Sequence, residues 1–267
     1  MMARDAGEGG IVTAIGKIKT PYRYYGAASD VYRSVRRVYR RITYSGSGVR
    51  CLVCDKEFKA WLRRSNTGRC PSCNSSTRHK IAAIYLSNLQ RKGELKGKKF
   101  LFFAPDPGLQ HLLRSWDVDV LTTDLSAPHV DLHADITALP MPDNSYDVIL
   151  ISHVLEHIPE DRAAMRELFR VLAPGGIALV QVPISDAPHT DEDPSVTDPK
   201  IRKLRWGLED HVRLYGRDLV DRLEKAGFQV EEMRLAQDMS DEELKRYGLW
   251  NDLLFVCHKL PATGQDS

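Results

Sequence analysis

Four of the five cysteines form two Cys-x2-Cys pairs, Cys51 with Cys54 and Cys70 with Cys73, and fifteen residues separate the pairs. Each pair can present two thiolates to one metal ion, and the intervening length allows the pairs to face each other. Four thiolates surround a Zn²⁺ ion completely and leave no position for water or substrate. We therefore predict one structural zinc ion, in preference to two disulfides, which a reducing compartment disfavours.

Three histidines, His153, His157 and His211, are candidates for acid–base chemistry. Histidine ionises near neutral pH and is the commonest general base. His153 and His157 are four residues apart, which on a helix would place them on one face, and they follow a strongly apolar segment. His211 follows Glu209 and Asp210, either of which can orient an imidazole. All three are catalytic candidates, and the alternative for each is a structural histidine that only makes hydrogen bonds.

Carboxylates occupy two further positions suited to binding. Asp124 ends an apolar run, and a carboxylate at the tip of a second parallel strand can accept hydrogen bonds from ribose hydroxyls. The segment 186–198 is acidic, and four of its side chains could hold a divalent cation: His189, Asp191, Glu192 and Asp193. A solvated loop is the favoured interpretation of that segment, because prolines interrupt it.

Apolar strands alternate with helical segments from residue 99 onward. The apolar runs predict strands at 100–104, 118–123, 131–134, 146–152, 177–182, 228–235 and 253–258. Helical periodicity predicts helices at 79–90, 108–115, 160–172 and 217–226, and a capping box predicts another that begins after Ser240. Residues 183–214 are predicted to be mostly irregular. The alternation predicts an α/β fold with a doubly wound, mostly parallel sheet and a hairpin-like edge formed by the last two strands.

The front of the chain differs from the rest in charge. Residues 1–99 carry 22 Lys and Arg against 6 Asp and Glu, whereas the remainder carries 16 against 30. Residues 1–30 show no periodicity and are expected to be loosely ordered, while 31–43 form a helix with arginines opposite an apolar face. We divide the chain into a basic extension (1–48), a zinc module (49–78), a linking helix (79–98), an α/β domain (99–260) and a tail (261–267).

The basic front of the chain has three interpretations. Its helix can be solvated, with the apolar side packed on the α/β domain; it can dock on an acidic surface, including that of a second copy in a homo-oligomer; or it can bind phosphate groups. No apolar run approaches the roughly 18 residues of a membrane span, and the first residues lack an apolar signal segment. The expected location is the cytoplasm.

Several strings in the α/β region resemble one family. They are Asp135-Ile-Thr-Ala-Leu-Pro140, Asp143-Asn-Ser-Tyr-Asp147, His153-Val-Leu-Glu-His157, Arg170-Val-Leu-Ala-Pro-Gly-Gly176 and Ala226-Gly-Phe228. Together they resemble the class I, Rossmann-like S-adenosylmethionine-dependent methyltransferases of the type-11-like branch, over about residues 99–260. The resemblance implies S-adenosylmethionine as the cofactor and S-adenosylhomocysteine as its product.

The same resemblance implies roles for individual residues. Asp124, with Leu125 beside it, would hold the ribose. Asp135 would lie near the adenine amine, with Ile136 against the ring. Ser152 and the histidine that follows it would flank the methionine moiety and the reacting methyl group.

The loop after the first strand departs from the family pattern. The family carries Gly-x-Gly-x-Gly there, whereas this chain reads Ala104-Pro105-Asp106-Pro107-Gly108. Only the last glycine remains, and a small alanine replaces the first. Ala104, Pro105, Asp106 and Gly108 are nevertheless predicted to line the cofactor, with Asp106 near its amino group. The altered loop leaves open a domain that does not bind the cofactor.

Three functions compete on these observations. The leading hypothesis is methyl transfer to an oxygen of a small molecule or sugar, which requires in-line alignment and a general base. An RNA methyltransferase is the second, because the front is basic, although an Asn-Pro-Pro-Tyr-type tetrapeptide does not follow the fourth strand. The third is a non-catalytic binding or scaffold protein.

Overall fold

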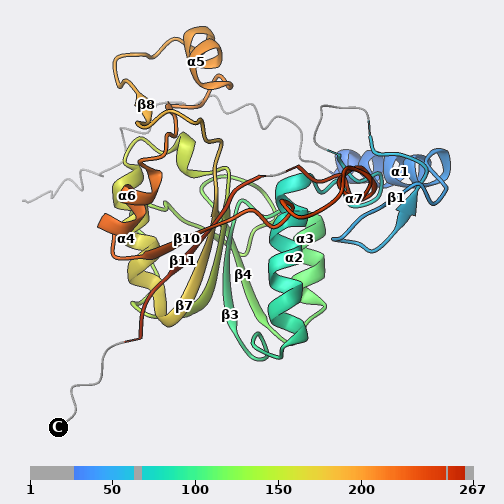
Figure 1. The fold of residues 1–267 in the computed structure, drawn as a ribbon, viewed down its shortest axis with the longest axis horizontal. Coiled ribbons are helices and arrows are strands. Elements are labelled where there is room, and N and C mark those ends of the chain that lie inside the picture. The colour runs from blue at the N-terminus through green and yellow to red at the C-terminus, as the bar shows by residue number, and fades with distance from the viewer. Residues whose placement is uncertain (1–26, 63–67, 251, 262–267) are drawn as a thin grey trace, which may run out of the picture.

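A computed structural model describes residues 27–62, 68–250 and 252–261, with side chains from residue 35 onward (Figure 1). Its centre is a seven-stranded sheet of order β10-β11-β7-β6-β3-β4-β5. The strands are β3 (Lys99–Phe103), β4 (Asp119–Asp124), β5 (Leu132–His133), β6 (Tyr146–Ser152), β7 (Leu172–Gln181), β10 (Gln229–Met233) and β11 (Leu254–His258). The neighbouring strands from β3 to β7 pair in parallel. In this sheet β11 is antiparallel to the other strands. The predicted mostly parallel sheet and its hairpin-like edge are confirmed.

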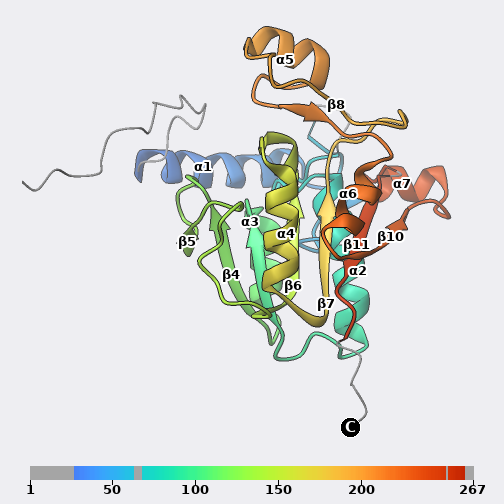
Figure 2. The ribbon, with the colours of Figure 1, turned by 90° about the vertical axis from the view of Figure 1, so that its left-hand side faces the viewer.

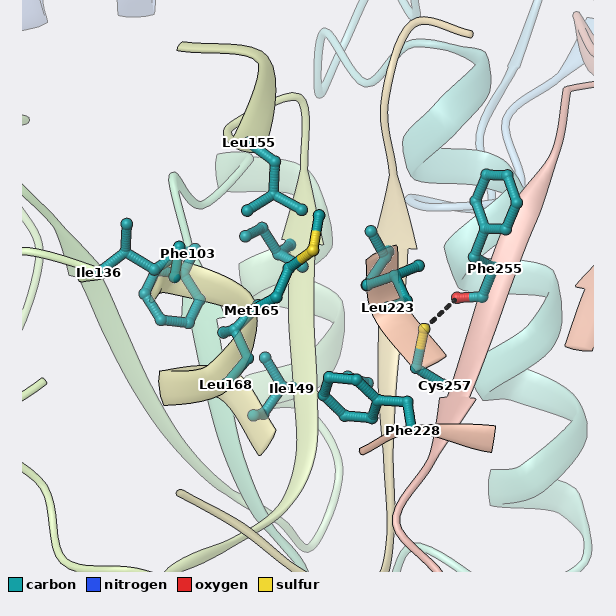
Figure 3. Close-up of a cluster of buried hydrophobic side chains, with 14 of the residues drawn as sticks. Phe103, Ile136, Ile149, Leu155, Met165, Leu168, Leu223, Phe228, Phe255 and Cys257 are labelled. Carbon is teal, nitrogen blue, oxygen red and sulfur yellow. Dashed lines mark hydrogen bonds between the residues drawn. The ribbon is translucent and has the colours of Figure 1, made fainter. Parts of the chain in front are cut away.

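Helices cover both faces of this sheet. Figure 1 shows α2 (Thr77–Arg91) and α3 (Pro107–Arg114) on one face and α4 (Asp161–Val171) and α6 (Leu219–Lys225) on the other. Successive side chains of a strand point to opposite faces, so a strand buried on both sides reads as a continuous apolar run. Accordingly Phe100 joins the core under α2, whereas Leu101 joins the core under α4 and α6. Figure 3 shows side chains of the second core, among them Met165, Leu168 and Leu223 from the helices and Ile149 from β6.

The strand order fixes where a ligand can enter. The order β5-β4-β3-β6-β7 is the 3-2-1-4-5 order of doubly wound nucleotide-binding folds, and it reverses between β3 and β6. In such sheets a crevice opens outside the carboxyl ends of the strands at the reversal. The segments that follow β3, β4 and β6 therefore border the candidate site.

The stretch 183–214 is more ordered than the sequence predicts. It contains β8 (Asp191–Glu192), α5 (Pro199–Trp206) and β9 (Arg213–Leu214), and it stands above the carboxyl edge of the sheet (Figures 1 and 2). Asp198 caps α5 by accepting from the backbone N–H of Lys200, and Pro199 occupies the first turn. Most of the stretch is irregular, as predicted, but α5 was missed because this short cap-and-proline signal was overlooked.

The acidic segment is not simply solvated either. Asp191 accepts hydrogen bonds from Arg205 and Trp206, and Glu192 accepts from Arg213 and Arg222. These arginines neutralise the carboxylates that could have bound a divalent cation. The segment instead holds α5 and α6 together through ion pairs.

The basic helix, α1 (Ala27–Thr43), begins four residues earlier than predicted, so residues 27–30 belong to it, whereas 1–26 lie outside the described residues. Its apolar side chains are not packed: Val35, Val38, Tyr39 and Ile42 are 55–71% exposed. For these four residues the structure contradicts packing of the apolar side on the α/β domain.

Four smaller elements complete the described fold. β1 (Val49–Arg50) and β2 (Glu57–Phe58) form a hairpin in the cysteine module, and α7 (Asp241–Tyr247) begins at the predicted capping box of Ser240 and Glu243. A 3-10 turn, η1 (Leu155–His157), follows β6. Among the described helices, none is long and apolar enough to cross a membrane.

Candidate functional site

The four paired cysteines converge in the module beside α2 and α3. The Sγ atoms of Cys51 and Cys73 lie 3.6 Å apart, as do those of Cys54 and Cys70. Tetrahedral zinc with Zn–S bonds of about 2.3 Å requires sulfurs ~3.8 Å apart, so the cluster fits the ion. The geometry is compatible with the predicted structural zinc.

The two Cys-x2-Cys pairs, here called knuckles, share one backbone conformation. In each, the residue after the second cysteine donates its N–H to the carbonyl of the first: Asp55 to Cys51 at 2.9 Å and Asn74 to Cys70 at 3.0 Å. Asp55 and Asn74 both adopt positive φ, at 53° and 66°. Asp and Asn tolerate this left-handed conformation better than other non-glycine residues.

The loop after β3 docks onto this module. Asp106 caps α3 by accepting from the N–H groups of Gly108 and Leu109 at 3.0 Å, and the same oxygen accepts from the hydroxyl of Ser75 at 2.7 Å. Its other oxygen lies 3.1 Å from Nδ1 of His79. Burial alone would raise the pKa of Asp106, but His79 and Ser75 outweigh it and the pKa lies below its usual value. Both carboxylate oxygens therefore have protein partners already.

Gly108 also serves the contact with the module. A Cβ atom at this position would lie 2.5 Å from Oγ of Ser75 and 2.8 Å from Cβ of Cys73. The position therefore requires glycine so that the second knuckle can approach α3. Two residues predicted to line the cofactor thus hold the module against the α/β domain.

The carboxyl edge of the sheet carries two strained residues. Ala104 follows β3 with φ 45°, and His153 follows the neighbouring β6 with φ 55°. Non-glycine residues in this region cost roughly 1–3 kcal/mol, and they gather at functional sites. Ala104 is exposed, so the backbone of its loop is open to a ligand.

Unpartnered polar atoms lie at the same edge. Among the described residues, Oγ1 of Thr123, Oγ of Ser152 and Nε2 of Gln181 are buried without a hydrogen-bond partner. They stand at the ends of β4, β6 and β7. Buried polar groups in folded proteins are nearly always satisfied, so such a group marks a place for a ligand or water.

The two predicted nucleoside carboxylates lie at neighbouring strand ends. Asp124 pairs in register with His133, and Asp135 follows two residues after that. Asp124 accepts backbone N–H groups on one oxygen, and exposed Asp135 accepts from Thr137. Two neighbours frame these carboxylates: Leu125, which is 64% exposed, and Ile136, which is buried.

All three candidate histidines converge on one carboxylate, that of Glu156. Nδ1 of His153 lies 3.2 Å from Oε1 of Glu156, and Nε2 of His211 lies 4.0 Å from the same oxygen. The ring centroids of His157 and His211 are 4.7 Å apart, with the rings nearly perpendicular. The segment from His153 to His157 contains a 3-10 turn and is not the α-helix on which their spacing was interpreted. The sequence prediction missed Glu156, although its place three residues after one candidate and beside another was a usable signal.

The turn that holds Glu156 is fixed by the strand that follows His211. Arg213 is buried and donates to the carbonyl oxygens of Leu155, Ile158 and Pro159. The N–H of the preceding residue, Val212, donates to the carbonyl of Glu156 at 2.9 Å. Backbone contacts therefore hold His211 close to the carboxylate of Glu156.

A cavity of about 500 Å³ opens beside these groups. His153 and Gln181 line it from the strand ends, and Thr77 lines it from the start of α2. Five charged side chains also line the cavity: Arg78, Asp186, Arg217, Arg234 and Asp252. Its volume lies in the ~300–1,000 Å³ range of small-molecule sites.

Comparisons with known proteins find similarity within the α/β domain. Residues 111–180 match a family model described as a methyltransferase domain. A Mycolicibacterium smegmatis protein named as a probable S-adenosylmethionine-dependent methyltransferase is 34% identical over 106 residues, which cover 39% of this chain and 37% of that protein. A ubiquinone/menaquinone biosynthesis C-methyltransferase of Salmonella arizonae is 49% identical over 49 residues, 18% of this chain and 20% of that protein. The chain thus matches 37% or less of the length of these relatives.

Two of the solved structures to which this chain is similar come from work on methyltransferases. The 1,6-didemethyltoxoflavin-N1-methyltransferase of Burkholderia thailandensis has a TM-score of 0.47 and 15% identity, covering 68% of this chain and 78% of that chain. A chain from the complex of the Haloferax volcanii Trm112 methyltransferase activator with a methyltransferase has a TM-score of 0.45 and 15% identity, covering 68% and 94%. The sequence matches, together with the sheet order described above, support an S-adenosylmethionine-dependent methyltransferase domain of class I.

Proposed function

We propose that this protein transfers the methyl group of S-adenosylmethionine to an oxygen of a small molecule or sugar. The observation that carries the proposal is His153, which lines the 500 Å³ cavity while its Nδ1 atom lies 3.2 Å from the buried Glu156. A histidine so placed can take a proton from a hydroxyl in the cavity. An oxygen acceptor needs such a base, whereas many nitrogen acceptors need less help.

The cofactor would lie across the ends of β3, β4 and β6. Asp124 would bind the ribose and Asp135 the adenine, while the unpartnered Thr123 and Ser152 supply polar contacts at the same edge. Since both oxygens of Asp106 have protein partners, we propose that its loop contacts the cofactor through backbone atoms of the exposed Ala104 and the half-buried Pro105. When bound, S-adenosylmethionine supplies an electrophilic methyl group.

The residues of this chain would then align the acceptor, remove its hydroxyl proton and keep water out of the site. Methyl transfer is an in-line displacement, so positioning the acceptor oxygen contributes much of the rate. His153 would accept the hydroxyl proton at Nε2, and the carboxylate of Glu156 would stabilise the resulting imidazolium near Nδ1. The segment with α5 and β8 stands above this edge and would limit access of water.

An RNA acceptor is the second candidate, because α1 presents the exposed Arg37 and Arg41. The cavity volume favours a small acceptor. A direct test is transfer of a labelled methyl group from S-adenosylmethionine into separated pools of small hydroxylated compounds, glycans and RNA. Label in the first two pools supports the proposal. Label in RNA alone overturns it, and failure to bind S-adenosylmethionine in calorimetry indicates a non-catalytic protein.

A further inference from the structure

The carboxylate of Glu156 lacks the partners that a buried charge requires. Its side chain is 1% exposed, and neither oxygen makes a hydrogen bond of acceptable geometry within the described structure. A buried carboxylate is strongly destabilising unless a cation neutralises it. The imidazoles of His153, His157 and His211 lie around it, and imidazole with carboxylate is a common donor set for a metal ion.

We infer that Glu156, His157 and His211 bind a divalent transition-metal ion. One ligand atom from each residue lies within 4.8 Å of the others. The 4.0 Å between Nε2 of His211 and Oε1 of Glu156 is too long for a direct hydrogen bond. Two ligands on one metal, with bonds of about 2.1 Å, lie ~3.0–3.5 Å apart, so a metal would draw the two atoms together by less than about 1 Å.

The second ring nitrogens are oriented as they are in metal sites. Nδ1 of His211 lies 2.7 Å from the carbonyl oxygen of Trp206, so this nitrogen donates and Nε2 presents its lone pair toward Glu156. Nδ1 of His157 lies 3.4 Å from a carboxylate oxygen of Asp210, which leaves Nε2 of that ring as its lone-pair donor. Metal-binding histidines almost always carry such a carbonyl or carboxylate partner, which fixes the tautomer.

The types of ligand atom narrow the choice of metal ion. Two imidazoles and one carboxylate suit Fe²⁺ or Zn²⁺ and leave positions open for water or another ligand. Mg²⁺ and Ca²⁺ prefer oxygen ligands alone. The site is distinct from the cysteine cluster, which uses only sulfur, and it lies beside the cavity that His153 lines. The inference does not depend on methyl transfer.

Cobalt binding tests the site in the intact chain with the cysteine cluster already loaded with zinc. We expect one additional equivalent of Co²⁺, with visible ligand-field bands but no thiolate charge-transfer band. Glu156→Gln and His211→Gln should weaken this binding at least tenfold and leave the zinc content unchanged. His111→Gln, an exposed histidine on α3, is the matched control and should bind as wild type does.

A readout on the wild-type protein guards against variants that fail to fold. Paramagnetic Co²⁺ should shift the imidazole proton signals of His157 and His211 far more than those of His111. The inference is overturned if wild type takes up no cobalt beyond the cysteine cluster, if both variants bind cobalt as tightly as wild type, or if the shifted signals belong to other histidines.

Discussion

The predicted cofactor residues fall into two groups according to the contacts that their atoms make. Asp106 and Gly108 face the cysteine module, where a carboxylate caps α3 and a missing Cβ permits close packing. Asp124 and Asp135 instead stand at strand ends beside unpartnered polar atoms. We therefore expect substitutions in the first group to affect folding and substitutions in the second to affect cofactor binding.

Asp124→Ala should weaken S-adenosylmethionine binding by roughly 1.5–3 kcal/mol, because it removes charge-assisted hydrogen bonds to the ribose. Isothermal titration calorimetry measures this loss. Asp117→Ala changes an exposed carboxylate just before β4, at the opposite end of that strand, and should leave the affinity unchanged. Equal affinities for Asp124→Ala and wild type would remove Asp124 from the cofactor site.

His153→Asn should lower the single-turnover methyl-transfer rate by about 10²–10⁴-fold at saturating S-adenosylmethionine, the range of general-base contributions. Asparagine is chosen because it tolerates the positive φ of this position, so the backbone stays in place. His129→Asn changes another histidine with positive φ, at 66°, outside the cluster, and serves as the control. A rate within threefold of wild type would show that another group removes the proton.

At the scale of elements, two docked units frame the crevice. The cysteine module is held by Asp106 and by Lys80, whose buried ammonium donates to the carbonyls of Gly68 and Tyr247 at 2.6 and 2.9 Å. On the other side, Arg222 and Arg213 join α6 and β9 to Glu192 of β8. The cysteine module also shares an apolar core with α2 and the sheet, through Val49, Val53 and Phe58.

We expect freshly purified protein to contain one zinc ion per chain in the cysteine cluster, since zinc supplies much of the folding free energy of so small a module. Cys54→Ser should lose that ion and make residues 49–76 sensitive to limited proteolysis. Cys257→Ser, which alters a buried thiol in β11, controls for loss of any cysteine. Protein that contains no zinc, or a Cys54→Ser module as resistant as wild type, would reject the assignment.

The pairing of Glu192 makes its unit sensitive to acid. The hydrogen bond from Arg222, together with Arg213, outweighs burial and lowers the pKa of Glu192 to about 2. An unfolded glutamate ionises near pH ~4.3, so this charge stabilises the fold above that pH, and the stabilisation disappears as the pH falls toward 2. Glu192→Gln should therefore lower the Tm at pH 7, and the difference from wild type should vanish near pH 2–3.

Thermal melts from pH 7 to pH 2 measure this difference. Glu224→Gln, on the exposed side of α6, should follow wild type throughout. A Glu192→Gln protein whose Tm at pH 7 equals that of wild type would show that the ion pairs contribute nothing to stability.

At the scale of the whole molecule, charge and apolar surface coincide on α1. The helix lies in the half of the sequence with 22 basic and 6 acidic residues, and its side chains Val38, Tyr39 and Ile42 are more than half exposed. Arginines on a helix beside exposed apolar residues are typical of a segment that lies on an anionic membrane surface. An RNA contact would use the arginines but not the apolar side chains.

We therefore expect binding to vesicles that contain anionic lipid at about 50 mM salt, weakening toward 300 mM as charge is screened. Val38→Ser with Ile42→Ser should abolish binding without loss of stability, because both side chains are largely exposed. Ile201→Ser, an exposed apolar change on α5, is the control. Tight binding to RNA that falls steeply with salt, with no vesicle binding, would instead favour the RNA methyltransferase.

The sequence alone determined the features that depend on neighbours along the chain. Apolar runs between helical segments predicted the strands, since a strand buried on both faces reads as a continuous apolar run. The spacing of Cys51, Cys54, Cys70 and Cys73 predicted a compact four-thiolate cluster. Segment boundaries moved by a few residues, and α5 was missed because its signal is only an Asp-Pro cap. The cofactor roles of Asp124 and Asp135 remain predictions.

The tertiary structure decided which distant residues meet. His153 and His211 both lie near Glu156 because Val212, just before β9, hydrogen-bonds to the turn after β6, and no local pattern encodes that contact. In the same way, both carboxylate oxygens of Asp106 have protein partners because a separate module docks on its loop. A sequence shows which groups can bind or react, whereas the packing of elements decides which groups remain available, because a buried polar atom bonds to whichever partner the fold places beside it.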